Sequence, residues 1–369
     1  MKRILYLFLV VAIVAWCAPV FAAPQSIPPN ATLSADGVND GVLITAPATL
    51  TVDGTGGFAN IGDTLGVSVN TDAADQGTVV FSTISVVSGD MGDNTRTLAD
   101  IQLVDGATTV TFNGAVYSVL MKVAANTKAV FNDGSINNKA AVNFTGDGTI
   151  DVAANTKVTG ALTNAGADTG TLNLYGAASG TDQWTGAVGG ASGLKSINVV
   201  GGSNTAGIFS KITGAVNVYD LELATNTLNI DGALTLHSSS IINTTLASAS
   251  VYGKVVPTGV ATEVDGFSVN VAVPSGSYLP VGTLFNIVDA TSGTGDIPVV
   301  VTLAAGTNPL YTFSANPTTN GLVQIEVTGS PIKPADPLPD PIADVVDDAL
   351  ETLPVDSEIV LAINALTSL

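Results

Sequence analysis

The stretch TGAVNVYDLELATNTLNIDGALTL, residues 213–236, carries the pattern that decides the fold of this chain. Its runs GAVNVYDLEL and NTLNIDGALTL have strand length and alternate apolar with polar residues. Asx and glycine residues between such runs supply the positive φ that tight turns need. One tetrapeptide begins the stretch as TGAV at Thr213 and returns as DGAL at Asp231. Strands and turns therefore repeat here with no helix between them.

This tetrapeptide has the form polar-Gly-Ala-Leu/Val. It occurs three more times, as NGAV at Asn113, TGAL at Thr159 and TGAV at Thr185. Periods in the twenties, built only from strands and turns, fit one coil of a parallel β-helix. Val, Ile, Leu and Phe would fill the interior of each coil, and Thr, Asn and Ser would form outer ladders. We therefore predict an all-β chain whose residues 23–250 form a right-handed parallel β-helix. Stacked sandwich modules are the main alternative.

A second echo is the hexapeptide VAANTK, at residues 123–128 and again at residues 152–157. Its two copies are identical, and LATNTL at Leu223 resembles them. We interpret the hexapeptide as one corner of a coil that is repeated above itself. Asn126 and Asn155 should then lie on the same side of the β-helix, about 5 Å apart in adjacent coils or about 10 Å apart two coils away.

The composition changes toward the C-terminus. Residues 251–329 have longer strands, denser aromatics and more prolines, which predicts a C-terminal β cap over the last coil. Residues 330–341, SPIKPADPLPDP, predict a stiff extended linker. Residues 342–369 are predicted as short α-helices. In IADVVDDALETL the apolar residues share one helical face: Ile342, Val345, Val346, Ala349, Leu350 and Leu353.

The N-terminus has the features of a secretory signal peptide over residues 1–22. Lys2 and Arg3 precede an apolar run, and small residues end it at Ala22, where we expect cleavage. Cys17 is the only cysteine and lies within this segment. The exported chain would contain no disulfide, so its stability must come from a large ordered core.

Charge and composition exclude several functions. The net charge is −20, with 11% charged residues, and such a chain repels nucleic acid and anionic lipid. His237 is the only histidine, and its neighbours Ser238, Ser239 and Ser240 on one strand do not provide triad geometry. One histidine and no exported cysteine exclude an ordinary zinc site. We expect no catalytic residue and no cofactor.

Two acidic clusters are the remaining candidate sites: Asp90 and Asp93 with Arg96 in SGDMGDNTR, and Asp147 and Asp151 in TGDGTIDVA. Carboxylate oxygens could bind calcium, so these four aspartates are the calcium candidates. Acids beside a basic residue could also form the cleft of a polysaccharide-active β-helix. Neither cluster matches a known calcium loop. Turn chemistry explains Asp-Gly and Asp-Asn pairs without a metal.

The order of these segments resembles the autotransporters, the type V secretion proteins of Gram-negative bacteria. GLKSINVVGG, residues 213–236 and LPVGTLFNIVDATSGTG are similar to the passenger regions of rickettsial-type outer-membrane surface antigens. VDDALETL and VLAINALTSL are similar to the helical stretch before their translocator barrel. The resemblance implies such a barrel as partner. We expect either that this barrel lies on another chain or that the sequence is a truncated gene product that ends before the barrel. Without a barrel, the chain could reach only the periplasm.

We therefore expect a non-enzymatic passenger, a stalk or adhesin that is exported to the cell surface, outer membrane or extracellular space. A β-helical polysaccharide lyase or hydrolase is one alternative, and a secreted S-layer-like fibre protein is another. Expected partners are the translocator barrel, a host or cell-surface ligand and, through stacked strand edges, a second copy of the chain. No nucleic acid partner is expected.

Overall fold

The computed structural model describes residues 25–27, 31–33, 42–44, 48–53, 58–61, 67–104, 109–132, 135–176, 182–201, 209–263, 266–290, 292–293, 299–316 and 322–331. The predicted signal peptide, most of the predicted linker and residues 342–369 lie outside these ranges. Every regular element in them is a β-strand, so the all-β prediction is confirmed. None of these residues forms a helix long and apolar enough to cross a membrane.

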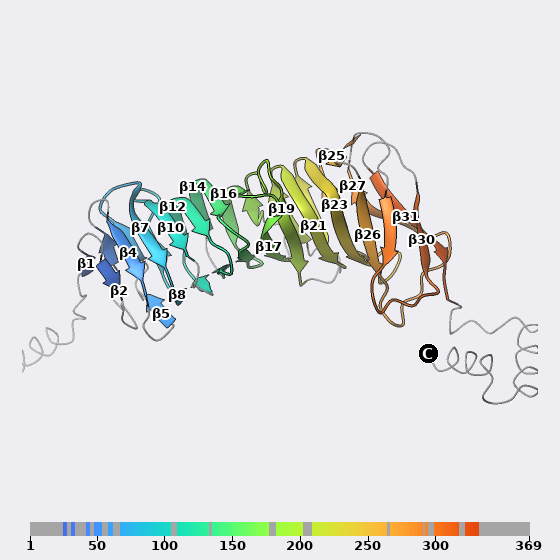
Figure 1. The fold of residues 1–369 in the computed structure, drawn as a ribbon, viewed down its shortest axis with the longest axis horizontal. Coiled ribbons are helices and arrows are strands. Elements are labelled where there is room, and N and C mark those ends of the chain that lie inside the picture. The colour runs from blue at the N-terminus through green and yellow to red at the C-terminus, as the bar shows by residue number, and fades with distance from the viewer. Residues whose placement is uncertain are drawn as a thin grey trace, which may run out of the picture. The chain divides into compact units, whose positions relative to one another are not determined.

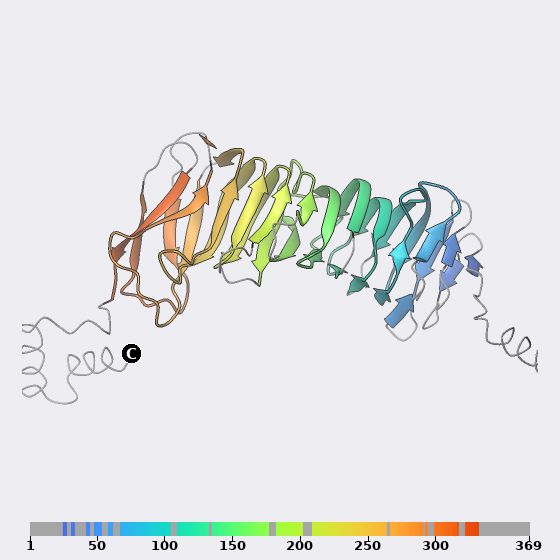
Figure 2. The ribbon, with the colours of Figure 1, turned by 180° about the vertical axis from the view of Figure 1, so that it is seen from behind.

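Contacts divide the chain into two compact units. Of the described residues, unit 1 holds those up to 173 together with 183–192, and unit 2 holds 174–176, 182 and those from 193 to 331. In each unit, parallel strands of successive coils stack on one another, so the predicted parallel β-helix is confirmed. Figure 1 shows the stacked strands labelled in chain order, and Figure 2 shows the same order from behind.

Three parallel ladders build unit 1. The first consists of β1 (Gln25–Ile27), β3 (Val42–Ile44), β6 (Val67–Thr71), β9 (Asp90–Met91), β12 (Val116–Val123), β14 (Ser135–Phe144), β16 (Lys157–Asn164) and β18 (Trp184–Thr185). The second runs through β2 (Ala31–Leu33), β4 (Thr49–Val52), β7 (Gln76–Phe81) and β10 (Leu98–Leu103) and joins β12. The third runs through β5 (Phe58–Ile61), β8 (Ile84–Val87), β11 (Val110–Phe112), β13 (Lys128–Phe131), β15 (Thr149–Val152) and β17 (Thr169–Tyr175), whose last two residues belong to unit 2.

Unit 2 continues the pattern and ends in an antiparallel cap. One parallel ladder runs through β20 (Phe209–Thr213), β22 (Thr227–Asp231), β24 (Lys254–Pro257) and β27 (Leu284–Asp289). The other runs through β19 (Leu194–Val200), β21 (Val216–Ala224) and β23 (Leu234–Thr245) and then divides into β25 (Val260–Glu263) with β28 (Ser292–Gly293) and β26 (Phe267–Ala272) with β29 (Val299–Leu303). The antiparallel strands are β27, β31 (Leu322–Gly329) and β30 (Thr312–Asn316), within the predicted cap region.

Strict alternation of inward and outward residues produces the core. In β7, Gly77, Val79 and Phe81 are buried, and the residues between them face outward. Register then places like residues above one another, because Phe112 pairs with Phe131 in the next coil. The ring of Phe112 lies 5.9 Å from Phe81 and 5.3 Å from Phe131, and all three are fully buried. Each such side chain contributes about 2 to 3 kcal/mol through removal from water.

Glycine explains why the repeated tetrapeptide marks a coil. A Cβ on Gly186 would lie 2.3 Å from the carbonyl oxygen of Gly160, and one on Gly232 would lie 2.4 Å from that of Gly214. The tetrapeptides at Thr159 and Thr185 are thus stacked in unit 1, and those at Thr213 and Asp231 are stacked in unit 2. Only glycine allows the two backbones to approach this closely.

The interpretation of VAANTK as one repeated corner is wrong. Lys128 pairs with Thr149 at the start of β13 and β15, so the first copy leads into this pair of strands. Phe131 pairs with Val152 at their end, so the second copy leads out of it. Asn126 and Asn155 therefore lie at different corners of the coil. Asn126 has a positive φ of 57°, which suits a tight turn at its corner.

Coil length also varies more than a fixed repeat would allow. Gln25 pairs with Val42 in the next coil, whereas Val255 pairs with Val288, almost twice as far along the chain. The coils differ in the number of residues in the connections between strands, because a ladder requires only that its strands pair in register. The offset between two copies of a motif is therefore no sign that the copies are stacked.

Candidate functional site

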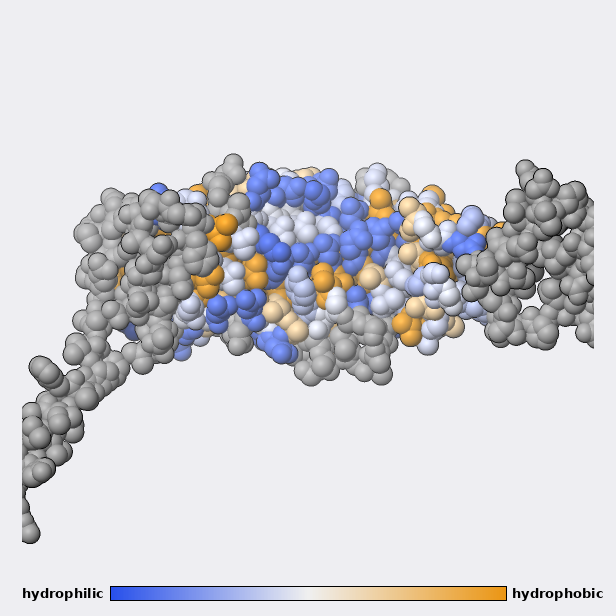
Figure 3. Space-filling view, turned by 90° about the horizontal axis from the view of Figure 1, so that it is seen from below, coloured by the Kyte–Doolittle hydropathy of each residue, from blue (hydrophilic) through white to orange (hydrophobic). Residues whose placement is uncertain are grey.

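The outward positions of the strands form the surface on which a functional site must lie. On the face drawn in Figure 3, hydrophilic residues cover much of the described surface, and apolar residues are scattered among them. Among the described residues, no three His, Cys, Asp or Glu side chains gather in an arrangement that could hold a metal ion.

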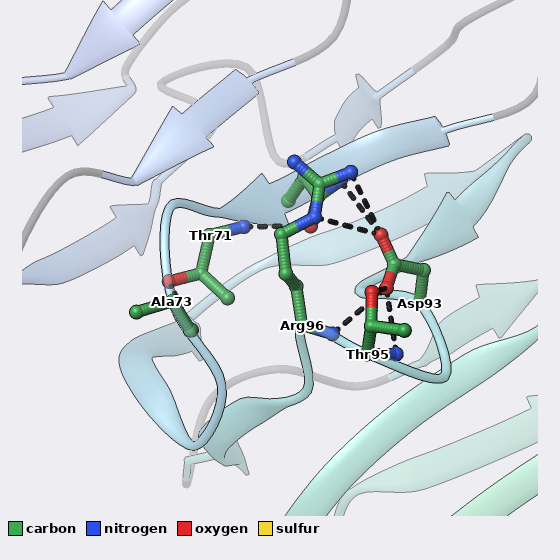
Figure 4. Close-up of polar contacts among 6 residues, drawn as sticks. Thr71, Ala73, Asp93, Thr95 and Arg96 are labelled. Atoms are coloured by element: carbon green, nitrogen blue, oxygen red, sulfur yellow. Dashed lines mark hydrogen bonds and ion pairs between the residues drawn. The ribbon is translucent and has the colours of Figure 1, made fainter.

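Asp93 organises the turn between β9 and β10 (Figure 4). Its Oδ1 accepts hydrogen bonds from the Thr95 amide at 2.8 Å, the Thr95 hydroxyl at 2.6 Å and the Arg96 amide at 2.7 Å. Its Oδ2 accepts from Arg96 Nε at 3.0 Å and from Asn70 Nδ2 at 3.3 Å, and Arg96 also forms an ion pair with it. Arg96, the predicted basic partner of an acidic cleft, is thus bound to Asp93 itself.

These donors set the charge state of Asp93. The Thr95 hydroxyl, followed by the amides of Thr95 and Arg96 and by Asn70, lowers the pKa of the Asp93 carboxyl well below 3.8, against a smaller opposing effect of burial. Asp93 is therefore a firmly ionised group that accepts hydrogen bonds. A general acid needs a raised pKa, so its environment does not suit that role.

Asp90 serves a different corner. Its Oδ1 accepts a hydrogen bond from the amide of Ala115 at 2.7 Å, one coil further along the chain. That amide belongs to the NGAV tetrapeptide, where a Cβ on Gly114 would lie 2.4 Å from the carbonyl carbon of Gly89. The carboxylate thus joins two coils at a crowded glycine corner.

The second acidic pair also joins coils. Asp147 accepts a bond from the Gly170 amide at 3.3 Å, and its carbonyl oxygen accepts one from the Asn126 amide at 3.2 Å. Asp151 is buried, forms an ion pair of 2.6 Å with Lys128 of the preceding coil and accepts from Asn173 Nδ2 of the following coil at 2.7 Å. The four calcium candidates are therefore all occupied by protein donors.

His237 lies in a ring stack in unit 2. Its imidazole stacks on Tyr219 with a centroid distance of 4.2 Å and an interplanar angle of 10°. Its buried Nε2 lies so close to Gly193 that a Cβ there would be 2.4 Å away. Neither Nε2 nor the buried hydroxyl of Ser240 has a hydrogen-bond partner among the described residues, so the two are not bonded to each other. Ser239 is exposed, and the side chain of Ser238 lies outside the described part.

A polar column on the outer face of unit 2 was missed by the sequence reasoning. We call it the amide ladder, and it consists of Glu222, Asn243, Asn270 and Thr302, paired in register across β21, β23, β26 and β29. Asn243 donates to Glu222, Asn270 donates to Asn243 at 2.8 Å, and Thr302 donates to Asn270 at 3.2 Å. Burial raises the pKa of Glu222, aided by the nearby charge of Asp220.

The amide ladder has no regular period in the sequence. The interval between successive members grows along the chain because the connections between the strands differ in length. The only available signal is an outward polar residue in each alternating strand. Such a column offers carboxyl, amide and hydroxyl groups at the spacing of the coils, which suits binding of a polar ligand.

The chain is 33% identical over 202 residues, 53% of its length, to a protein of Rickettsia rickettsii named outer membrane protein A. The matched region spans 8% of that relative. No model of a known protein family matches the chain.

Proposed function

We propose that this protein is a non-enzymatic passenger displayed at the bacterial cell surface, a structural stalk or adhesin of the autotransporter type. The observation that carries the proposal is how the outward carboxylates are used. Asp90, Asp147 and Asp151 each bind a donor in a neighbouring coil, and Asp93 closes a turn. The polar chemistry therefore serves the stacking of coils, as a stalk requires.

The similarity to outer membrane protein A supports an outer-membrane or surface location. An outer-membrane translocator barrel is the partner that this proposal requires, and the predicted signal peptide would direct the chain across the inner membrane. The parallel solenoid suits such a route, because coils can be added one after another and each contacts mainly its neighbours.

Surface accessibility tests the location. Intact cells that carry the gene are treated with a protease that cannot cross the outer membrane, and the chain is followed with an antibody against its described residues. We expect loss of the chain while a periplasmic marker survives. Protection of the chain in intact cells, with digestion only after permeabilisation, would overturn the proposal.

Binding and catalysis are tested on the purified chain. If the amide ladder forms part of an adhesive face, Asn243→Ala with Asn270→Ala should reduce binding to a glycan and host-cell panel at least about tenfold, since two bridging amides are lost. Asn229→Ala on β22 provides the control with an outward amide in the other ladder of unit 2. If the double variant binds as well as Asn229→Ala, the amide ladder has no adhesive role and only the stalk role remains. Release of products from polyuronates by the purified chain would overturn the non-enzymatic assignment.

A further inference from the structure

Exposed apolar side chains gather where the chain leaves the cap of unit 2. They are Tyr278, Val281, Leu284 and Leu310, with exposed fractions of 37%, 62%, 46% and 52%. We call them the exit patch. None of the four carries a charge, and residues 266–331 contain no lysine or arginine.

Tyr311 fixes the two loops that carry most of the exit patch. Its hydroxyl donates to the carbonyl oxygen of Ser277 at 2.8 Å and accepts from the amide of Leu279 at 3.3 Å. Tyr311 and Leu279 are buried. The loop that contains Tyr278 and Val281 is thereby tied to the segment that contains Leu310, so the patch is held in place before anything binds to it.

Strand pairing places the patch around the exit point. β31 lies between β27 and β30, where Leu284 pairs with Glu326 and Thr312 pairs with Gly329 (Figures 1 and 2). A Cβ on Gly329 would lie 3.3 Å from the carbonyl oxygen of Leu310, and the amide of Gly282 donates to Val327 at 2.9 Å. The strands on either side of β31 are on the order of 10 Å apart, about the diameter of an α-helix.

The sequence beyond the exit point contains a segment that needs an apolar partner. Residues 342–353 are predicted to be helical, with six apolar residues on one face. A helix this short is marginal alone in water, so its stability depends on covering that face. The proline-rich residues 332–341 span about 30 Å when extended, which is enough to return the segment to the exit patch.

We propose that residues 342–353 dock on the exit patch of the same chain, with their apolar face against Val281, Leu284 and Leu310. The short tether gives the segment a millimolar effective concentration at the patch. The inference does not depend on the proposed surface function.

Hydrogen exchange of the full chain tests the docking. We expect the amides of residues 343–353 to exchange more slowly than in a free peptide of this sequence, and Val281→Ser with Leu310→Ser to speed their exchange at least about tenfold. Val300→Ser is the matched control, because Val300 on β29 is also 62% exposed. Leu350→Ser, on the proposed docking face, should have the same effect as the double variant.

Three outcomes would overturn the proposal. The first is exchange in residues 343–353 as fast as in the free peptide, and the second is protection that the Val281 and Leu310 substitutions leave unchanged. The third is protection that disappears on dilution, because it would assign the exit patch to a second copy of the chain. Protection that is independent of concentration, sensitive to the patch and insensitive to Val300→Ser supports docking within one chain.

Discussion

Replacing Gly232 with alanine probes the close approach of coils that the repeated tetrapeptide encodes. The new Cβ would lie 2.4 Å from the oxygen and 2.6 Å from the carbon of the Gly214 carbonyl. The coils must separate by about 1 Å to reach ordinary contact. Since the φ of Gly232 lies outside the left-handed region, the cost comes from crowding and not from an unfavourable backbone angle.

The magnitude follows from the hydrogen bonds beside this contact. The Val216 amide donates to Ala233 at 2.8 Å, and the Gly259 amide donates to Gly232 at 2.9 Å, so separation weakens bonds to both neighbouring coils. Overpacking costs about 1 to 3 kcal/mol, and each weakened bond costs about 0.5 to 1.5 kcal/mol. The lower entropy of alanine in the unfolded chain returns about 0.4 to 1 kcal/mol. We expect a net loss of about 2 to 4 kcal/mol in the free energy of unfolding of unit 2.

Urea unfolding combined with hydrogen exchange at the Val216 and Gly259 amides measures this loss within unit 2. Gly166→Ala in unit 1, followed by urea unfolding of that unit, is the control for a Gly→Ala change without crowding, because its φ is also ordinary and a Cβ there meets only Thr169 Cγ2 at 4.0 Å. That variant should be neutral or slightly more stable. A Gly232→Ala protein within about 0.5 kcal/mol of the wild type would refute the reasoning that stacked glycines set the distance between coils.

Three further substitutions test the contacts of unit 1. Asp93→Asn should lower the free energy of unfolding by about 1 to 2 kcal/mol at pH 7, by weakening charged hydrogen bonds. Because the folded-state pKa of Asp93 is depressed, this contribution is present above about pH 4 and is lost as the pH falls further. In urea unfolding, the stability difference between the wild type and Asp93→Asn should therefore be smaller at pH 2.5 than at pH 7. A difference that is the same at both pH values contradicts this prediction. Asp151→Ala should cost about 2 kcal/mol in thermal unfolding by leaving the Asn173 amide without its acceptor, whereas exposed Asp53→Ala should change stability by less than about 0.5 kcal/mol. Phe112→Ala should cost about 3 to 5 kcal/mol in urea unfolding, and a cost below about 1 kcal/mol would contradict close packing of the Phe112 ring against the rings of Phe81 and Phe131.

The fold was predictable because its determinants are local. Alternation in runs such as residues 216–224 separates inward from outward residues, and glycine followed by alanine marks a corner where backbones meet. Neither signal needs knowledge of which coil is the neighbour. Both depend on the steric demands of a residue on the backbone next to it, which a single sequence records directly.

The candidate sites were less predictable because they depend on register. The residue types in SGDMGDNTR suggested a carboxylate cluster. In the structure, Asp90 instead accepts a hydrogen bond from Ala115, and Asp93 accepts hydrogen bonds from Thr95, Arg96 and Asn70. Two of these partners, Ala115 and Asn70, come from neighbouring coils. Which donors face a carboxylate is decided only when the coils above and below it are in place.

The sequence by itself determined that the described part of the chain is all-β, that its strands bury one face, and that glycine corners recur from coil to coil. Tertiary structure alone decided which repeats coincide in space. VAANTK looked like the best-preserved repeat but occupies two different corners, whereas the irregularly spaced Glu222, Asn243, Asn270 and Thr302 form one hydrogen-bonded column. The physical reason is that stacking fixes the register of strands and leaves the length of the connections free, so distance along the chain does not measure distance between coils.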